Sequence, residues 1–244
     1  MKKFTNLIVL LLVMSFISGC SVNGKTKDNT EQSDTTTVDT KPEKMTQVKF
    51  NVAINDTKGE IIIQLYNETP QHRDNFIKLV NEKFYDGVLF HRIIQQFMIQ
   101  CGDPDSKNAR PNQQLGGGGV GYTIPAEFVS TLFHKRGAVA AARLGDMQNP
   151  TKASSGCQFY IVDGRKFSAA DMQMMAQRSG HQWTPDQINT YETIGGAPHL
   201  DGAYTVFGEV IKGMEVVDLI AAQPKNNFDR PLKDIKIISA TIVE

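Results

Sequence analysis

From residue 47 onward, short runs with the pattern of β-strands alternate with turn residues. Residues 47–54 alternate polar and apolar side chains, as a half-buried strand does, and residues 59–66 form a similar run. The residues between them, 55–58, have turn chemistry, so we predict a β-hairpin in which Gly59 takes a positive φ. Further apolar or alternating runs occupy residues 88–101, 137–143, 157–163, 203–211 and 234–243.

Two other segments have the period of a helix. Thr69 and Pro70 are typical of an N-cap and a first helical residue, and a second helix is predicted at 213–222. Seven or eight strands with only two such helices favour a mainly β fold, a closed eight-stranded antiparallel barrel whose open ends the two helices cover. The apolar face of the first helix is predicted to consist of Phe76, Leu79, Val80 and Phe84, before an exit at Gly87.

Residues 166–196 interrupt the strand pattern. Ser168 and Thr184 are each followed three residues later by a side chain that can bond back to the cap, Asp171 and Gln187. We therefore predict a small insert of two short helices. Its three methionines fit either a buried helical face or a peptide-contacting surface: Met172, Met174 and Met175.

The N-terminal residues have the pattern of a targeting segment. A lysine pair precedes an apolar stretch at 7–17, which is typical of a secretory signal and shorter than the roughly 20 residues that a membrane-spanning helix needs. Residues 17–21 resemble the lipobox of bacterial lipoproteins, whose signal is cut before an acylated cysteine. The resemblance implies a signal peptide at 1–19, lipidation of Cys20 and an extracytoplasmic protein anchored to the bacterial cell membrane. An ordinary secretory signal is the alternative.

The segment of residues 20–46 that follows is almost entirely polar. Such a segment buries too little apolar surface to fold, so we expect a lipidated cysteine and a disordered tether there, followed by one folded domain at 47–244.

Composition and charge exclude several classes of function. Lys plus Arg and Asp plus Glu both total 26, so no broadly basic surface is available and we expect no nucleic-acid partner. Cys101 and Cys157 lie in apolar runs, which indicates buried, unpaired thiols. The five histidines have no metal-binding spacing, so we expect no metal and no other cofactor.

One stretch carries specific motifs. Phe90-His91-Arg92 is followed by Phe97-Met98, Gln100 and Gly102-Asp103, a series that resembles the catalytic strand pair of cyclophilins. The resemblance continues through residues 116–119, 155–161 and 199–208, and it covers residues 47–244 apart from the insert. It implies a cyclophilin-like barrel and a peptidyl-prolyl cis–trans isomerase that acts on proline-containing polypeptide clients and assists the folding of secreted or surface proteins.

The chemistry of this reaction agrees with the residues. Rotation about the bond before a proline must overcome a barrier of about 18–20 kcal/mol, and because no bond is broken, no nucleophile is needed. A fixed cation beside the proline nitrogen in a dry pocket would favour the twisted imide, and the guanidinium of Arg92 is suited to this role, with Gln100 orienting it or holding a carbonyl. The resemblance implies these substrate-binding residues: Phe97, Met98, Ala142, Arg143, Gln158, Tyr160, His199, Leu200 and Tyr204.

Some positions depart from the family pattern. Tyr160 stands where Phe is common, Tyr204 where many members have His, and His199 where some eukaryotic members have a Trp that contacts cyclosporin. We therefore expect weak cyclosporin binding. Arg143 replaces a frequent Asn, but the peptide contact at that position is made by the backbone.

His91 is not interpreted as an acid or base, because the reaction moves no proton between heavy atoms. Two other functions stay open. A non-catalytic proline-peptide-binding chaperone module would keep the groove and use the insert for its clients, although the complete motif argues against it. A lipoprotein that captures small solutes would usually have two α/β lobes.

Overall fold

A computed structural model describes residues 44–243 of the chain. The predicted signal peptide, Cys20 and nearly all of the predicted tether lie outside these residues. Within the described part, residues 45 and 46 already contact the fold, because the Thr46 carbonyl accepts a hydrogen bond from the Leu65 amide at 2.9 Å and Met45 packs against buried side chains. The folded unit therefore begins slightly before the predicted residue 47.

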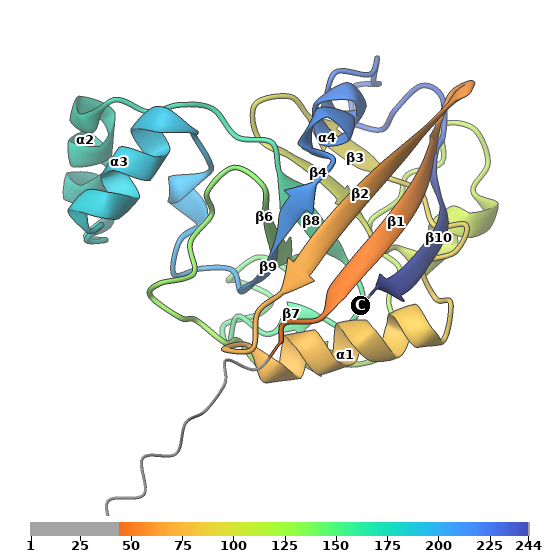
Figure 1. Cartoon of the computed structure of the whole chain (residues 1–244), viewed down its shortest axis with the longest axis horizontal. Helices are drawn as coiled ribbons and strands as arrows, with labels where there is room; N and C mark the ends of the chain where they lie inside the picture. Colours follow the sequence, from red (N-terminus) through yellow and green to blue (C-terminus); the bar gives the residue numbers. More distant parts are fainter. Residues whose placement is uncertain (1–43, 244) are drawn as a thin grey trace, which may run out of the picture. The chain divides into compact units, whose positions relative to one another are not determined.

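Eight antiparallel strands form one sheet, in the order β10–β1–β2–β9–β6–β8–β4–β3 (Figure 1). Two further short strands, β5 and β7, form a small separate ladder that the sequence pattern did not predict. The bounds are β1 Gln47–Ile54, β2 Thr57–Leu65, β3 Arg92–Ile94, β4 Met98–Cys101, β5 Thr123–Ile124, β6 Ala138–Ala141, β7 Ser154–Ser155, β8 Phe159–Val162, β9 Val206–Lys212 and β10 Ile235–Val243.

The prediction of a mainly β, eight-stranded antiparallel fold is confirmed. The two edges of the sheet, however, are not paired strand to strand as in a fully closed barrel. The edge strands β10 and β3 are not neighbours in the sheet. The two edges are joined by the segment just before β3, where the Gly87 and Phe90 amides donate to carbonyls of β10 at 2.8 and 2.9 Å. From His91 onward the chain pairs with β4 instead: the His91 amide donates to the Gln100 carbonyl at 3.0 Å, and β3 has β4 as its one neighbour in the sheet.

The two predicted covering helices are present, α1 at Pro70–Asn81 and α4 at Met214–Ala221. Figure 1 shows them against opposite ends of the sheet. Helix α1 buries Phe76, Leu79 and Val80, while Phe84 lies three residues beyond its end and still packs against the core.

The insert also folds as predicted, with α2 at Ala169–Ser179 and α3 at Pro185–Thr193. Both capping boxes are formed. The two helices lie side by side at the edge of the domain, away from α1 (Figure 1). Met172 is fully buried and Met175 packs against the same small apolar cluster of the insert, whereas Met174 is half exposed. The buried-face interpretation therefore holds for Met172 and Met175 and not for Met174. Two short 3-10 helices lie at Pro104–Asn108 and Pro198–Leu200.

The first hairpin is tighter than predicted. Asn55, not Gly59, takes the left-handed conformation, with φ 54°, and Gly59 lies within β2 opposite Val52. Asparagine tolerates this region because its short side chain can hydrogen-bond locally. Gly59 is required for another reason: a Cβ there would lie 2.6 Å from the Val216 Cγ1 of α4.

The core is centred on packed aromatic rings inside the sheet. Phe76 contacts Tyr85, Phe159 and Phe207 with ring centroids 5.0 to 5.3 Å apart. Cys101 and Cys157 are buried and unpaired, as predicted. Among the described helices, none combines the length and the apolar character needed to cross a membrane.

Candidate active site

Strand register brings the predicted catalytic residues together. Arg92 on β3 is paired with Gln100 on β4, Gln100 is paired with Tyr160 on β8, and Tyr160 is paired with Ala140 on β6. Directly paired residues of antiparallel strands point to the same face, so Arg92, Gln100 and Tyr160 form one row. Met98 lies on that face too, two residues before Gln100.

This row forms the floor and one rim of a cleft of about 120 Å³. Loops after β6 and before β9 supply the remaining walls. The lining consists of nine residues, all of them on the list predicted from sequence: Arg92, Phe97, Met98, Gln100, Ala142, Arg143, Tyr160, Leu200 and Tyr204.

The guanidinium of Arg92 lies at the mouth of this cleft. Its side chain is 41% exposed, and its Nε lies 3.7 Å from a carboxylate oxygen of Asp229. This is a long, partly solvated ion pair, which contributes little energy and leaves the guanidinium donors available for a ligand. Asp229 is in turn held by Lys225, whose ammonium lies 2.7 Å from the other carboxylate oxygen.

Gln158 does not line this cleft, but it is connected to it. The Gln100 amide donates to Gln158 at 3.1 Å, and the Gln158 amide donates to the carbonyls of Gly116 and Gly118 at 3.0 and 2.7 Å. Gln158 therefore holds the glycine turn predicted beside the groove. The same turn, with Gln100, Ala142 and Arg143, lines a larger adjoining groove of about 570 Å³.

His199 is not one of the lining residues, but it lies next to one of them, Phe97. Its ring packs against that of Phe97 with centroids 5.2 Å apart. Arg143 has a buried side chain, which donates to the Ala203 carbonyl at 2.7 Å and stacks over the Tyr204 ring at 4.4 Å. The Arg143 side chain thus fixes the wall of the cleft, and the contact of its backbone with a peptide stays a prediction.

The hydroxyl of Tyr160 has a partner that sequence reasoning missed. It lies 2.9 Å from Nε2 of His134, and Nδ1 of His134 donates to Asp201 at 2.8 Å. His134 is 26 residues from Tyr160 and belongs to no motif identified in the sequence, so only the antiparallel packing reveals the pair. Burial raises the pKa of Tyr160 well above its usual value, so the phenol stays protonated.

His91 is buried, and neither of its ring nitrogens has a hydrogen-bond partner among the described residues. Burial lowers the pKa of His91 to about 4, although the Asp103 carboxylate opposes the shift. A neutral ring pointing at Gly116 agrees with the interpretation of His91 as a packing residue rather than an acid or base.

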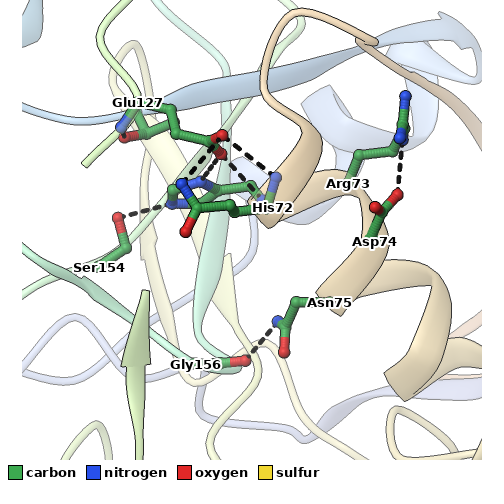
Figure 2. Close-up of polar contacts among 9 residues, drawn as sticks. His72, Arg73, Asp74, Asn75, Glu127, Ser154 and Gly156 are labelled. Carbon is green, nitrogen blue, oxygen red and sulfur yellow. Dashed lines mark hydrogen bonds and ion pairs between the residues drawn. The ribbon is translucent and has the colours of Figure 1, made fainter. Parts of the chain in front are cut away.

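A second group of reactive side chains lies at the N-terminal end of α1 (Figure 2). His72 has Nδ1 2.6 Å from Glu127 and Nε2 2.9 Å from the Ser154 hydroxyl, the order of a Ser–His–carboxylate triad. Ser154 is 1% exposed, however, and the cavity beside His72 has a volume of only about 10 Å³. No substrate can reach this serine, so the group links α1 to the loop of Glu127 and to β7.

The fold and the cleft define the class of protein: an eight-stranded antiparallel β domain with a proline-sized cleft and an arginine at its mouth. The chain belongs to the cyclophilin family, because the family profile described as cyclophilin type peptidyl-prolyl cis–trans isomerase/CLD matches residues 49–242. It is therefore an enzyme of the cyclophilin type, a peptidyl-prolyl cis–trans isomerase.

Curated relatives carry the same description. A putative peptidyl-prolyl cis–trans isomerase of Staphylococcus aureus is 32% identical over 200 residues, which covers 81% of this chain and 94% of that protein. A putative bifunctional phosphatase/peptidyl-prolyl cis–trans isomerase of Streptococcus pyogenes is 35% identical over 190 residues, which are 76% of this chain but 37% of that protein. The chain thus spans a little over a third of the streptococcal relative.

Solved structures share the fold. The cyclophilin type isomerase of Cryptosporidium parvum has a TM-score of 0.60 at 22% identity and covers 82% of this chain and 99% of its own. A second structure of that protein, determined in the presence of the dipeptide Ala-Pro, has a TM-score of 0.59.

Proposed function

We propose that this isomerase assists the folding of secreted or surface proteins while Cys20 anchors it to the outer side of the bacterial cell membrane, and that Arg92 is its central catalytic residue. The observation that carries the catalytic part is the position of the Arg92 guanidinium at the mouth of the apolar cleft. The location outside the cytoplasm rests on the lysine-led apolar stretch and the lipobox-like residues before Cys20.

The apolar walls of the cleft would take the proline ring and remove water from the imide. Phe97, Met98 and Leu200 supply these walls, and Met98 is 1% exposed. The proline nitrogen acquires a localised lone pair only when the imide twists, so a donor beside it binds the transition state more tightly than either planar isomer. An acceleration of about 10⁵ requires roughly 7 kcal/mol of such differential binding, which one charged donor in a desolvated site can supply.

Gln100 takes the second catalytic role in this proposal. Its side chain lies next to Arg92 across the β3–β4 pair and is held by Gln158, so its amide is oriented for a peptide carbonyl. The structure of the Cryptosporidium protein in the presence of the dipeptide Ala-Pro supports a proline-containing peptide as the ligand.

The test is replacement of Arg92 in an isomerisation assay on a prolyl tetrapeptide. We expect Arg92→Ala to lower kcat/KM at least about tenfold, because the donor that favours the twisted imide is lost. Circular dichroism and the unfolding midpoint should stay at wild-type values, since the one polar contact of the Arg92 side chain within residues 44–243 is a long surface ion pair.

Two further variants control this experiment. Arg92→Lys keeps the charge but loses the planar set of donors, so we expect activity between those of wild type and Arg92→Ala. Arg178→Ala removes an exposed arginine from α2 and should leave kcat/KM unchanged. Wild-type turnover by a folded Arg92→Ala protein would remove Arg92 from its proposed role.

The same assay distinguishes the proposed isomerase from the alternative, a non-catalytic proline-peptide binder. A fragment of residues 44–244, which is almost the whole of the compact unit Glu43–Glu244, should accelerate isomerisation and not merely bind the peptide. We expect only weak inhibition by cyclosporin, because His199 stands where the drug-contacting Trp of some members lies.

A further inference from the structure

A second hollow, of about 210 Å³, lies between the helical insert and the loop that leads into β6. Among its lining residues, Tyr204 alone was predicted from the sequence to bind substrate. The loop contributes aromatic and aliphatic side chains, and the insert contributes polar ones. The residues that matter here are Phe128, Leu132, Phe133, His181, Gln187 and Tyr204.

Tyr204 separates this hollow from the proline cleft, because it lines both. Its ring packs edge-on against Tyr160 with centroids 6.0 Å apart, and Arg143 stacks on it at 4.4 Å. The hollow is therefore one side chain away from the cleft. Since successive Cα atoms are 3.8 Å apart, a polypeptide with its proline in the cleft carries neighbouring side chains within reach of the hollow.

The wall of the hollow is held in place at three points. At its start, Glu127 accepts hydrogen bonds from the amide and ring of His72 at 3.0 and 2.6 Å (Figure 2). In its middle, the Ser130 carbonyl accepts a bond from Gln187 of α3 at 2.9 Å. At its end, His134 is bonded through its amide and its ring to Asp201. A wall with these anchors is preformed, so little ordering is needed when a ligand enters.

The carboxylate that borders the hollow, that of Asp201, already has its hydrogen-bond partners. The carboxylate of Asp201 accepts from His134 at one oxygen, and from the Trp183 indole and the Tyr191 hydroxyl at the other, at 2.7 and 2.5 Å. Burial alone would raise the pKa of Asp201, but these bonds outweigh it and hold the pKa below its usual range. Because the carboxylate has its partners, the hollow offers a ligand mainly its aromatic and aliphatic walls.

The exposure and size of the hollow indicate the kind of group it takes. Phe128 leaves 44% of its surface exposed at the rim, with the Lys152 ammonium 5.9 Å from the centroid of its ring, and the exposed part of the ring is available to an apolar group of a ligand. A cavity of about 150 Å³ is enough to hold a benzene molecule in another protein, so this hollow has room for one aromatic side chain and not for a larger ligand.

We propose that this hollow is a second substrate subsite, which binds an apolar and preferably aromatic side chain of the client polypeptide close to the isomerised proline. The insert then helps to select client sequences, because α3 and the turn at His181 complete the subsite. This proposal rests on the proposed function, since it assumes a client in the proline cleft.

The first test compares matched peptides with Phe or Ala at each of the two positions before and after the proline. At one of these positions we expect the wild-type kcat/KM to be about fivefold higher for Phe than for Ala, because a half-covered ring gains only part of its full burial energy. In Phe128→Ser this ratio should fall to about one. Met174→Ser, which changes an equally exposed apolar residue of the insert outside the hollow, should keep the wild-type ratio.

Two results of this test would overturn the proposal. One is the absence of any Phe preference in the wild-type enzyme at all four positions. The other is a loss in Phe128→Ser that is equal for the Phe and Ala peptides, since that would show a general effect on the fold or the cleft.

The second test uses fluorescence, which does not depend on turnover. Trp183 is the one tryptophan of the chain, and its indole bonds Asp201 at the border of the hollow. Titration with the preferred Phe peptide should change its emission saturably, and Phe128→Ser should weaken this binding about fivefold. If the enzyme isomerises the peptide but the emission does not respond, the subsite is wrong and the proposed function stands. If the emission responds without any isomerisation, the proposed function fails instead.

Discussion

Three histidines have a pKa that folding lowers, and this links the stability of the protein to pH. Burial lowers the pKa of His91 to about 4 and lowers the pKa of His199. Burial also lowers the pKa of His72, although the Glu127 carboxylate opposes the shift. A histidine whose pKa is lowered on folding takes up its proton more readily in the unfolded chain, so acid draws the protein toward unfolding.

We therefore expect the free energy of unfolding to be greatest above pH 6.5, the usual histidine pKa, and to fall as the pH drops toward 4. Each such imidazole contributes a slope of up to about 1.4 kcal/mol per pH unit. Urea denaturation of the 44–244 unit at pH 7, 6 and 5 measures this slope.

The share of His91 in this slope can be isolated with His91→Phe. Phenylalanine keeps a ring in the buried position, does not titrate, and loses no hydrogen bond, because neither ring nitrogen of His91 has a partner among residues 44–243. The variant should lose about 1 kcal/mol per pH unit of the slope between pH 6 and 5. An unchanged slope would contradict the buried, neutral state of His91.

At the scale of elements, α1 depends on a residue far from it in sequence. Thr69 occupies the N-cap position, as predicted, but its side chain makes no capping bond, and its hydroxyl is buried without a partner in the described structure. The free amides of Gln71 and His72 donate instead to the Glu127 carboxylate, at 3.1 and 3.0 Å. A negative charge at this end also complements the helix dipole.

This arrangement predicts opposite results for two substitutions. Glu127→Ala should lower the free energy of unfolding by about 1–2 kcal/mol, because the helix loses its cap and His72 loses the carboxylate bonded to its Nδ1. Thr69→Val, which exchanges the unpaired hydroxyl for a methyl of similar size, should be neutral or stabilising. Equilibrium unfolding in urea measures both.

Glu127→Gln is the matched control, since it keeps an acceptor for the helix amides and removes only the charge. We expect its effect to lie between those of wild type and Glu127→Ala. A large loss of stability in Thr69→Val would show that the threonine hydroxyl, and not Glu127, caps the helix.

At the scale of the whole molecule, the proposed anchor decides where the isomerase acts. A thioether-linked lipid on Cys20 would hold the chain at the membrane, because each buried acyl CH₂ contributes about 0.8 kcal/mol. We expect the wild-type protein in the membrane fraction. Cys20→Ser cannot form the thioether, so we expect it either in a different fraction or with its signal peptide uncut.

Metabolic labelling with radioactive palmitate gives the direct measurement, with label on wild type and none on Cys20→Ser. Ser21→Ala, at the adjacent position, should be labelled as wild type is. Unlabelled wild-type protein found in the medium would favour the ordinary secretory signal.

Much of the fold was predictable because its patterns are local. The strand runs, the two covering helices and both capping boxes of the insert depend on residues no more than a few positions apart. The cleft was predictable for a different reason: the motif around Arg92 and Gln100 resembles a family whose fold brings those positions together, and the nine residues of the lining follow.

Other features depend on contacts that no local pattern contains. Asn55 replaced Gly59 as the residue with a positive φ because Ile54 pairs with Thr57, which leaves two residues in the turn and places Gly59 within β2. Glu127 replaced the Thr69 side chain as the cap of α1 because a distant loop reaches the helix.

The sequence by itself determined most strands of the main sheet, the two covering helices and the insert, because these follow local periodicity and capping patterns. It also determined the class of the protein and the residues of its cleft, because several separate motifs resemble one family. Only the tertiary structure decided how Tyr160 is held by His134 and Asp201, how the insert is joined to the barrel and where a second hollow lies beside Tyr204. Hydrogen bonds between buried groups form wherever packing brings a donor and an acceptor together, and such pairs carry no signal in the spacing of residues along the chain.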